Sequence, residues 1–222
     1  MLNIKVCGMT EMAQIHALGE LGVNFIGFIF YEKSPRYVFH QLTEKEIRKK
    51  KNEIKVINGT FKKVGVFVNK NPQEIRHIVD ECGLDFVQLH GNETPEYCNM
   101  LFAKVPIIKA FSIDEQSDIK SIIQPYQEFV DYFLFDAATK NYGGSGKKFN
   151  WKLLENQEIN KPFFLSGGII ADDVEIIISL IKQNAMKGLF SLDINSKFEI
   201  EPGIKNIPVI QNFLQQINAN RI

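Results

Sequence analysis

Asp136 is placed where α/β enzymes hold catalytic groups. It follows the apolar run Phe133-Leu134-Phe135 and opens a polar segment that reaches Lys148 and contains Gly143, Gly144 and Gly146. The run has the pattern of a buried strand, whereas the glycines exclude a stable helix interior. A rigid strand end fixes a carboxylate and the following loop admits a substrate. We therefore consider Asp136 a candidate catalytic acid; the alternative is an aspartate that caps a turn.

Cys7 ends a second short apolar run and precedes Gly8. Because neighbouring residues of a strand face opposite sides, Lys5 and Cys7 are expected to face the interior of a closed sheet while Ile4 and Val6 face its helices. A buried lysine needs a carboxylate, and Asp136 and Asp193 are both candidates. Acting as a general base, Cys7 would be a thiolate with a pKa below about 8.5; the alternative is a small buried hydrophobe.

Two further side chains could contact a ligand. His90 ends the run Val87–His90 before Gly91, whereas the other three histidines are expected at the surface, so a metal site built from several histidines is not indicated. Arg36, one of only four arginines, lies in the loop after the second apolar run. Its planar fork suits a carboxylate, although a surface arginine is the alternative.

Two glycine- or amide-containing segments could bind a phosphate. Ser166-Gly167-Gly168-Ile169 follows the seventh candidate strand, and Asp193-Ile194-Asn195-Ser196 follows the eighth. Loops at these positions of α/β barrels commonly hold phosphate with free backbone N–H groups. The double glycine could also be a simple turn.

Apolar runs of strand type alternate with segments of helical spacing along the whole chain. The candidate strands are Ile4–Cys7, Phe25–Phe30, Lys63–Val68, Phe86–His90, Pro106–Phe111, Tyr132–Phe135, Phe163–Ser166 and Gly188–Leu192. The candidate helices are Thr10–Leu21, Thr43–Glu53, Pro72–Cys82, Thr94–Phe102, Asp114–Gln124, Trp151–Gln157, Asp172–Ile181 and Val209–Ile217. Thr10, Thr43, Asn71 and Thr94 are expected to cap helices.

Eight strand and helix repeats without a linker predict a single (β/α)8 TIM barrel over residues 1–222. An open, doubly wound sheet is the alternative, but its usual Gly-rich turn is missing, because Cys7-Gly8-Met9-Thr10 is not GxGxxG. The segment around Gly143 likewise does not fit a P-loop.

Composition excludes several classes of partner. Lys plus Arg and Asp plus Glu number 26 each, so no overall charge favours nucleic acid or an anionic membrane. The three cysteines form no CxxC pair, and no signal peptide or membrane-spanning run is present. We expect a cytoplasmic protein.

Seven segments in order resemble the phosphoribosylanthranilate isomerases of tryptophan biosynthesis. They are Lys5–Thr10, Gly27–Val38, Gly65–Asn69, Val87–Glu93, Phe135–Trp151, Pro162–Ile169 and Leu192–Gly203. The resemblance implies a (β/α)8 barrel that rearranges N-(5-phosphoribosyl)anthranilate, a small phosphoribosyl molecule, without metal or cofactor, as a monomer or a homodimer.

The resemblance also implies roles for individual residues. Asp136 would be the general acid and Cys7 the general base. Arg36 would bind the anthranilate carboxylate and Asp193 the sugar hydroxyls, with His90 near the substrate. The phosphate would be bound by Gly167, Gly168, Asn195 and Ser196.

Two other functions remain open from the sequence. The related isomerase of histidine biosynthesis uses carboxylates at both catalytic positions, and Cys7 argues against it. A phosphosugar-binding barrel without activity could have lost Cys7 or Asp136, yet both residues are present.

Overall fold

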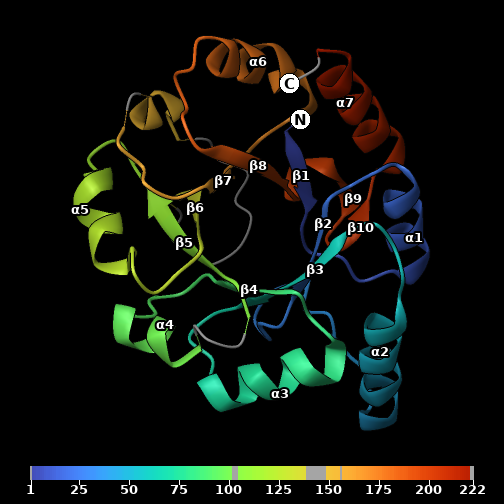
Figure 1. The fold of residues 1–222 in the computed structure, drawn as a ribbon. Helices are drawn as coiled ribbons and strands as arrows, with labels where there is room; N and C mark the ends of the chain where they lie inside the picture. Colours follow the sequence, from blue (N-terminus) through green and yellow to red (C-terminus); the bar gives the residue numbers. More distant parts are fainter. Residues whose placement is uncertain (1, 102–104, 139–148, 156, 221–222) are drawn as a thin grey trace.

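Eight parallel strands form a closed barrel surrounded by helices (Figure 1). The computed structural model describes residues 2–101, 105–138, 149–155 and 157–220. The glycines of the segment after Asp136, at positions 143, 144 and 146, therefore lie outside the described residues. The predicted barrel is confirmed.

The strands follow one another around the barrel in chain order, and β8 closes it against β1. They are β1 (Asn3–Val6), β2 (Phe25–Ile29), β3 (Lys62–Phe67), β4 (Phe86–Leu89), β5 (Ile107–Ile113), β6 (Tyr132–Ala137), β7 (Phe163–Leu165) and β8 (Leu189–Ile194). All eight predicted strands are present, and no end is shifted by more than two residues.

The helices form the outer layer. They are α1 (Met12–Glu20), α2 (Glu44–Val56), α3 (Pro72–Cys82), α4 (Pro95–Leu101), α5 (Ile119–Ile123), α6 (Val174–Lys182) and α7 (Ile207–Ala219), with the short 3-10 helices η1 (Gln124–Tyr126), η2 (Trp151–Leu154), η3 (Ala171–Asp173) and η4 (Ser196–Phe198). Thr43 and Asn71 cap α2 and α3 as predicted, and the Thr94 hydroxyl accepts a hydrogen bond from the Tyr97 N–H.

Three local predictions are wrong. Thr10 does not cap α1; its hydroxyl donates to the Gly203 carbonyl, and Glu11 precedes the helix instead. The fifth helix starts only at Ile119, because Asp114 accepts hydrogen bonds from its own turn and Asp118 provides the cap. The segment after Trp151 forms the 3-10 helix η2, since Glu155 is already extended.

Aromatic side chains close the amino end of the barrel. Phe25, Phe86, Tyr132 and Phe190 come from the amino ends of the four even-numbered strands, and their rings pack edge-on or tilted with centroids 5.0–5.8 Å apart. Layers of four side chains from alternate strands are the usual filling of such a barrel. This layer leaves the carboxyl end for polar groups.

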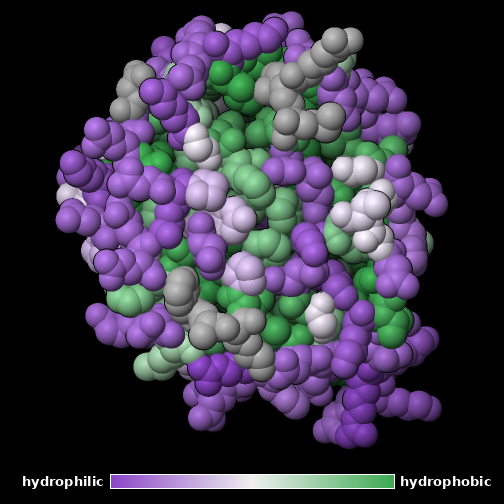
Figure 2. Space-filling model, in the orientation of Figure 1, coloured by the Kyte–Doolittle hydropathy of each residue, from purple (hydrophilic) through white to green (hydrophobic). Residues whose placement is uncertain are grey.

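A larger apolar cluster lies between the barrel and its helices. Ile4 and Val6 belong to it, whereas Lys5 faces inward, as the alternation of β1 predicts. On the face shown in Figure 2, hydrophilic residues surround the rim and hydrophobic residues lie closer to the centre.

A hairpin that the sequence analysis did not predict follows β8. It pairs β9 (Glu199–Glu201) with β10 (Ile204–Lys205), and Gly203 in its turn has φ +90°. Hydrogen bonds between Gln14 of α1 and the backbone of Lys205 hold the hairpin beside the first helix. Among the described residues, no helix is both long and apolar enough to cross a membrane.

Candidate active site

The predicted site residues meet at one end of the barrel. Because all eight strands are parallel, their carboxyl ends share one side. Cys7 follows β1, His90 follows β4 and Asp136 lies near the end of β6, while Gly167 and Asn195 follow β7 and β8. Residues far apart in the chain are thus brought to one mouth.

Cys7 is held tightly at this mouth. Its side chain is buried, and its N–H donates to the Ile194 carbonyl over 3.0 Å. Gly27 of β2 lies beside it, and a Cβ at this position would stand only 2.8 Å from the Cys7 Sγ. A glycine at position 27 therefore makes the space that the sulfur occupies.

The predicted low pKa of Cys7 is wrong. Burial raises the pKa of the Cys7 thiol above its usual value, and the charges of Lys5 and Lys205 offset this only in part. The carboxylate of Asp193 raises the pKa further. The sequence places a lysine two residues away, but it does not show that the sulfur is dehydrated or that this lysine is neutralised by a carboxylate.

Lys5 forms a buried ion pair with Asp193, not with Asp136. The Lys5 Nζ donates to the Asp193 Oδ1 over 2.9 Å, and the lysine side chain is fully buried. Burial lowers the pKa of Lys5, but the interactions with Asp193 and Cys7 together outweigh it and leave that pKa above its usual value. The pair joins the first and last strands below Cys7.

His90 contacts the candidate acid. Its Nε2 lies 3.3 Å from the Asp136 Oδ2, and its Nδ1 lies 2.8 Å from the Gln88 amide nitrogen. Both ring nitrogens of His90 therefore have a polar neighbour, which fixes the plane of the ring. The Asp136 Oδ1 accepts from the Ala137 N–H over 2.9 Å. Both carboxylate oxygens are therefore oriented.

Arg36 is buried and bound to a carboxylate of the protein. Its Nε donates to both oxygens of Glu199 over 2.9 Å, and its Nη2 donates to the Oε2 over 2.5 Å. The alternative of a surface arginine is therefore wrong, since Arg36 is only 7% exposed. Burial opposes ionisation of Glu199, but the hydrogen bond from Arg36 and the charge of Lys205 hold its pKa below the usual range.

Lys205 connects Glu199 to the loop after β8. Its Nζ donates to the Glu199 Oε1 over 2.6 Å and to the Asn195 Oδ1 over 2.7 Å. The same Asn195 oxygen would be 2.9 Å from a Cβ at Gly8, and the Arg36 Cδ would be 2.7 Å from it. The loops after β1, β2 and β8 therefore touch at Gly8.

The candidate phosphate segments lie on neighbouring strand ends. Leu165 of β7 pairs with Leu192 of β8, so the residues that follow them are adjacent. Gly167 and Gly168 have φ of +87° and +72°, a conformation that favours glycine. Asn195 and Ser196 are half-buried at the start of η4.

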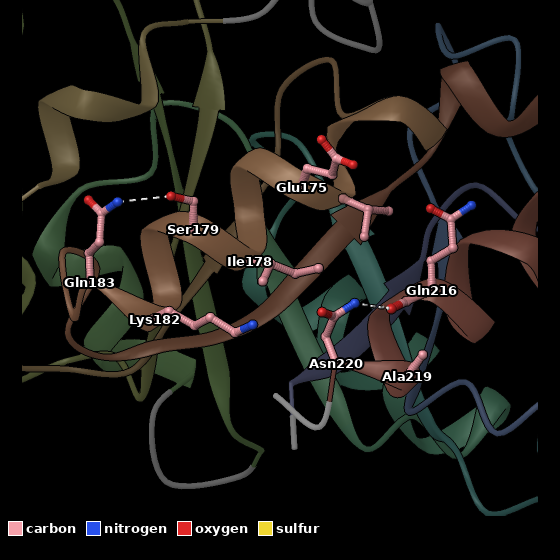
Figure 3. A pocket seen from close by; sticks show the side chains of 9 residues that line it. Glu175, Ile178, Ser179, Lys182, Gln183, Gln216, Ala219 and Asn220 are labelled. Carbon is pink, nitrogen blue, oxygen red and sulfur yellow. Dashed lines mark hydrogen bonds between the residues drawn. The ribbon is translucent and has the colours of Figure 1, made fainter.

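A groove on the outer layer lies away from these residues. It has a volume of about 540 Å³ and lies between the length of α6 and the carboxyl end of α7, lined by Glu175, Ser179, Lys182, Gln216 and Asn220 among others (Figure 3). Across the described part of the chain, no group of three or more His, Cys, Asp or Glu side chains could hold a metal ion.

A family model described as N-(5'phosphoribosyl)anthranilate (PRA) isomerase matches residues 4–216. This chain belongs to that family. The isomerase of Parabacteroides distasonis is 43% identical over 216 residues, which cover 96% of this chain and 92% of the relative. The isomerase of Phocaeicola vulgatus is 38% identical, covering 96% and 97%.

Solved structures of the family share the fold. The PRA isomerase of Thermotoga maritima superposes with a TM-score of 0.81 at 31% identity and covers 99% of this chain and 100% of its own. A second isomerase structure, with a TM-score of 0.77 at 27% identity and coverage of 99% and 100%, holds reduced 1-(o-carboxyphenylamino)-1-deoxyribulose 5-phosphate.

Several charged residues of this family member were not singled out from sequence. Glu199, which Lys205 holds in turn, binds Arg36. The buried pair of Glu93 with Lys109, 3.0 Å apart, holds the loop that follows His90. Glu93 and Glu199 lie inside two of the seven resembling segments. Charged residues next to strand ends in such segments are the one signal that could have indicated them, because hydrophobic periodicity does not show which charges are buried.

Proposed function

We propose that this chain converts N-(5-phosphoribosyl)anthranilate to 1-(2-carboxyphenylamino)-1-deoxyribulose 5-phosphate, an Amadori rearrangement of tryptophan biosynthesis. Asp136 is the general acid and Cys7 the general base. Membership of the PRA isomerase family supports the reaction. The observation that carries the residue roles is the position of Cys7 after β1 and of Asp136 in β6, at one barrel mouth and separated by β7 and β8.

The reaction needs one proton donor and one acceptor. Asp136 protonates the furanose ring oxygen, and the ring opens to a Schiff base. Cys7 then removes the proton on C2', and the enolamine becomes the ketone as a proton leaves the 2'-hydroxyl and one reaches C1'. The substrate and product are isomers, so each turnover ends with the proton gained by Cys7 and lost by Asp136. The two groups must exchange protons with water before the next turnover.

His90 and Gln88 orient Asp136. The His90 Nε2 lies 3.3 Å from the Asp136 Oδ2, and its Nδ1 lies 2.8 Å from the Gln88 amide nitrogen. The proton that Asp136 delivers in the first step is replaced from water between turnovers. His90 is thus a positioning residue beside the acid and the sugar.

The remaining side chains bind the substrate. Arg36 binds the anthranilate carboxylate. Asp193 accepts from sugar hydroxyls through its Oδ2, since Lys5 donates to Oδ1. The phosphate is bound at Gly167, Gly168, Asn195 and Ser196. The two glycines have positive φ, and successive backbone N–H groups in such turns form concavities that bind anions.

We further propose one domain of residues 1–222, acting in the cytoplasm without metal or cofactor, as a monomer or a homodimer. The buried, unpaired cysteines 7, 82 and 98 support a reducing compartment. A dimeric isomerase is named among the solved relatives, that of Thermotoga maritima.

The loss of anthranilate fluorescence tests this proposal. The phosphoribosyl substrate is generated in solution, the purified chain is added without metal, and the signal is followed. We expect a decay that depends on the concentration of the chain. No decay, with phosphosugar binding still detectable by calorimetry, would favour the histidine-pathway substrate or a binding-only barrel.

A further inference from the structure

Glu199 occupies one edge of the Arg36 guanidinium and leaves the other edge free. The guanidinium has five N–H donors. Glu199 accepts from Nε and from Nη2, at 2.9 and 2.5 Å. Among the described residues, Nη1 has no hydrogen-bond partner. Both Nη1 hydrogens and one Nη2 hydrogen therefore remain, in the fork geometry that binds a second carboxylate with two bonds.

The charges of this cluster call for an additional anion. Arg36 and Lys205 contribute two positive charges, and Glu199 contributes one negative charge. The side chain of Arg36 is 8% exposed, that of Glu199 3% and that of Lys205 0%. A buried excess of positive charge is unfavourable without a counter-ion. A carboxylate at the free edge of Arg36 would balance it.

The backbone around Glu199 fixes the direction in which the guanidinium points. The Glu199 Oε1 also accepts from the Gly203 N–H over 3.1 Å. The Gly203 carbonyl in turn accepts from the Thr10 hydroxyl. The side-chain amide of Gln14 donates to the Lys205 carbonyl and accepts from the Lys205 N–H. The position of the Glu199 carboxylate is therefore fixed by the hairpin and does not depend on the conformation of Arg36.

We propose that Glu199, held by Lys205, is a positioning residue that aims Arg36 at the carboxylate of the arylamine substrate. The inference rests on the proposed function, in which Arg36 binds that carboxylate. Glu199 thereby makes the site selective for an aryl group that carries a carboxylate, while the sugar and phosphate are bound elsewhere.

The variant Glu199→Gln tests the inference with two substrates. An amide keeps the size of the side chain, but its NH2 group cannot accept from Nη2, so Arg36 loses its bidentate partner. With N-(5-phosphoribosyl)anthranilate we expect KM to rise about tenfold or more, the effect of one charge-assisted hydrogen bond, with kcat little changed. With N-(5-phosphoribosyl)aniline, which lacks the carboxylate, KM should stay at the wild-type value.

Two controls separate positioning from general damage. Glu201→Gln changes an exposed glutamate of the same hairpin and should leave both substrates unaffected. In an Arg36→Ala background, Glu199→Gln should cause no further loss. Equal losses for both substrates, or a full additional loss in that background, would overturn the inference.

Calorimetry separates this inference from the proposed function. One probe is reduced 1-(o-carboxyphenylamino)-1-deoxyribulose 5-phosphate, the compound bound in a solved relative. The other probe is the same compound without the carboxylate on its aryl ring. If the wild-type chain binds both but turns over no substrate, the proposed function fails. Weaker binding of only the carboxylated probe by Glu199→Gln then still supports the inference, and equal binding overturns it. If the wild-type chain does not bind the carboxylated probe, the proposed function and the inference about Glu199 are both overturned.

Discussion

Cys7 has to act as a base in surroundings that favour its neutral thiol. Burial raises its pKa, and Asp193 adds to the effect, while Lys5 and Lys205 lower it. The thiolate is therefore the minor form near neutral pH. Turnover then depends on the small fraction of molecules in which Cys7 is ionised.

Alkylation of Cys7 reports this pKa directly. Only the thiolate reacts with iodoacetamide, so the rate should keep rising as pH increases beyond about 8.5, the value for an unperturbed cysteine. The modified residue is identified by peptide mass spectrometry. Cys82 and Cys98, whose pKa is raised to about 12 by burial in the helices, serve as slow internal references. If the alkylation rate of Cys7 instead reached a plateau below a pH of about 8.5, the raised pKa of Cys7 would be contradicted.

At the scale of elements, loop contacts fix the directions of the site residues. Glu93 accepts from the Asn69 and Gly91 N–H groups, at 2.8 and 2.9 Å, and pairs with Lys109. The loops after β3 and β4 are thereby joined behind His90. Between β6 and β7, Gly167 packs so closely that a Cβ would lie 2.6 Å from the Ala137 nitrogen and 3.2 Å from the Asp136 Oδ1.

Gly167→Ala should therefore impair catalysis as well as stability. The methyl group would push the end of β6 and misplace Asp136, and small misplacements can cost about 100-fold in rate. Gly22→Ala is the matched control: Gly22 also has a positive φ, +79°, but nothing lies within 4 Å of its Cβ position. We expect that control to lose only about 1 kcal/mol, measured by urea unfolding, with kcat unchanged. An unchanged kcat in Gly167→Ala would contradict the proposed contact.

For the whole molecule, the alternation of apolar runs predicted the eight strands and the faces of Lys5 and Cys7. It could not identify partners across the barrel. The Lys5 pair with Asp193 spans 188 positions and the Arg36 pair with Glu199 spans 163. Hydrophobic periodicity shows which face of a strand a residue occupies. Its partner on another strand depends on the strand register and on how the barrel closes. Thr10 is of a residue type that commonly caps helices, yet its hydroxyl donates to the Gly203 carbonyl in the hairpin turn.

Closure of the barrel gives the chain its proposed activity, because it brings β1 and β6 to one mouth. Lys5 and Asp193 form their ion pair between the first and last strands, where the barrel closes. The aromatic layer at the amino end packs the opposite side. The fold therefore presents Asp136 on a rigid strand and Cys7 directly after one.

The most direct measurement is kcat for Cys7→Ala and Asp136→Asn in the fluorescence assay with N-(5-phosphoribosyl)anthranilate. Each change should lower kcat by about 10²- to 10⁴-fold, the usual contribution of a general acid or base. Cys98→Ala, which removes a buried cysteine of α4, serves as the control and should keep kcat near the wild-type value. Thermal unfolding of each variant checks that the barrel is intact. Full activity in either Cys7→Ala or Asp136→Asn would contradict the proposed acid and base.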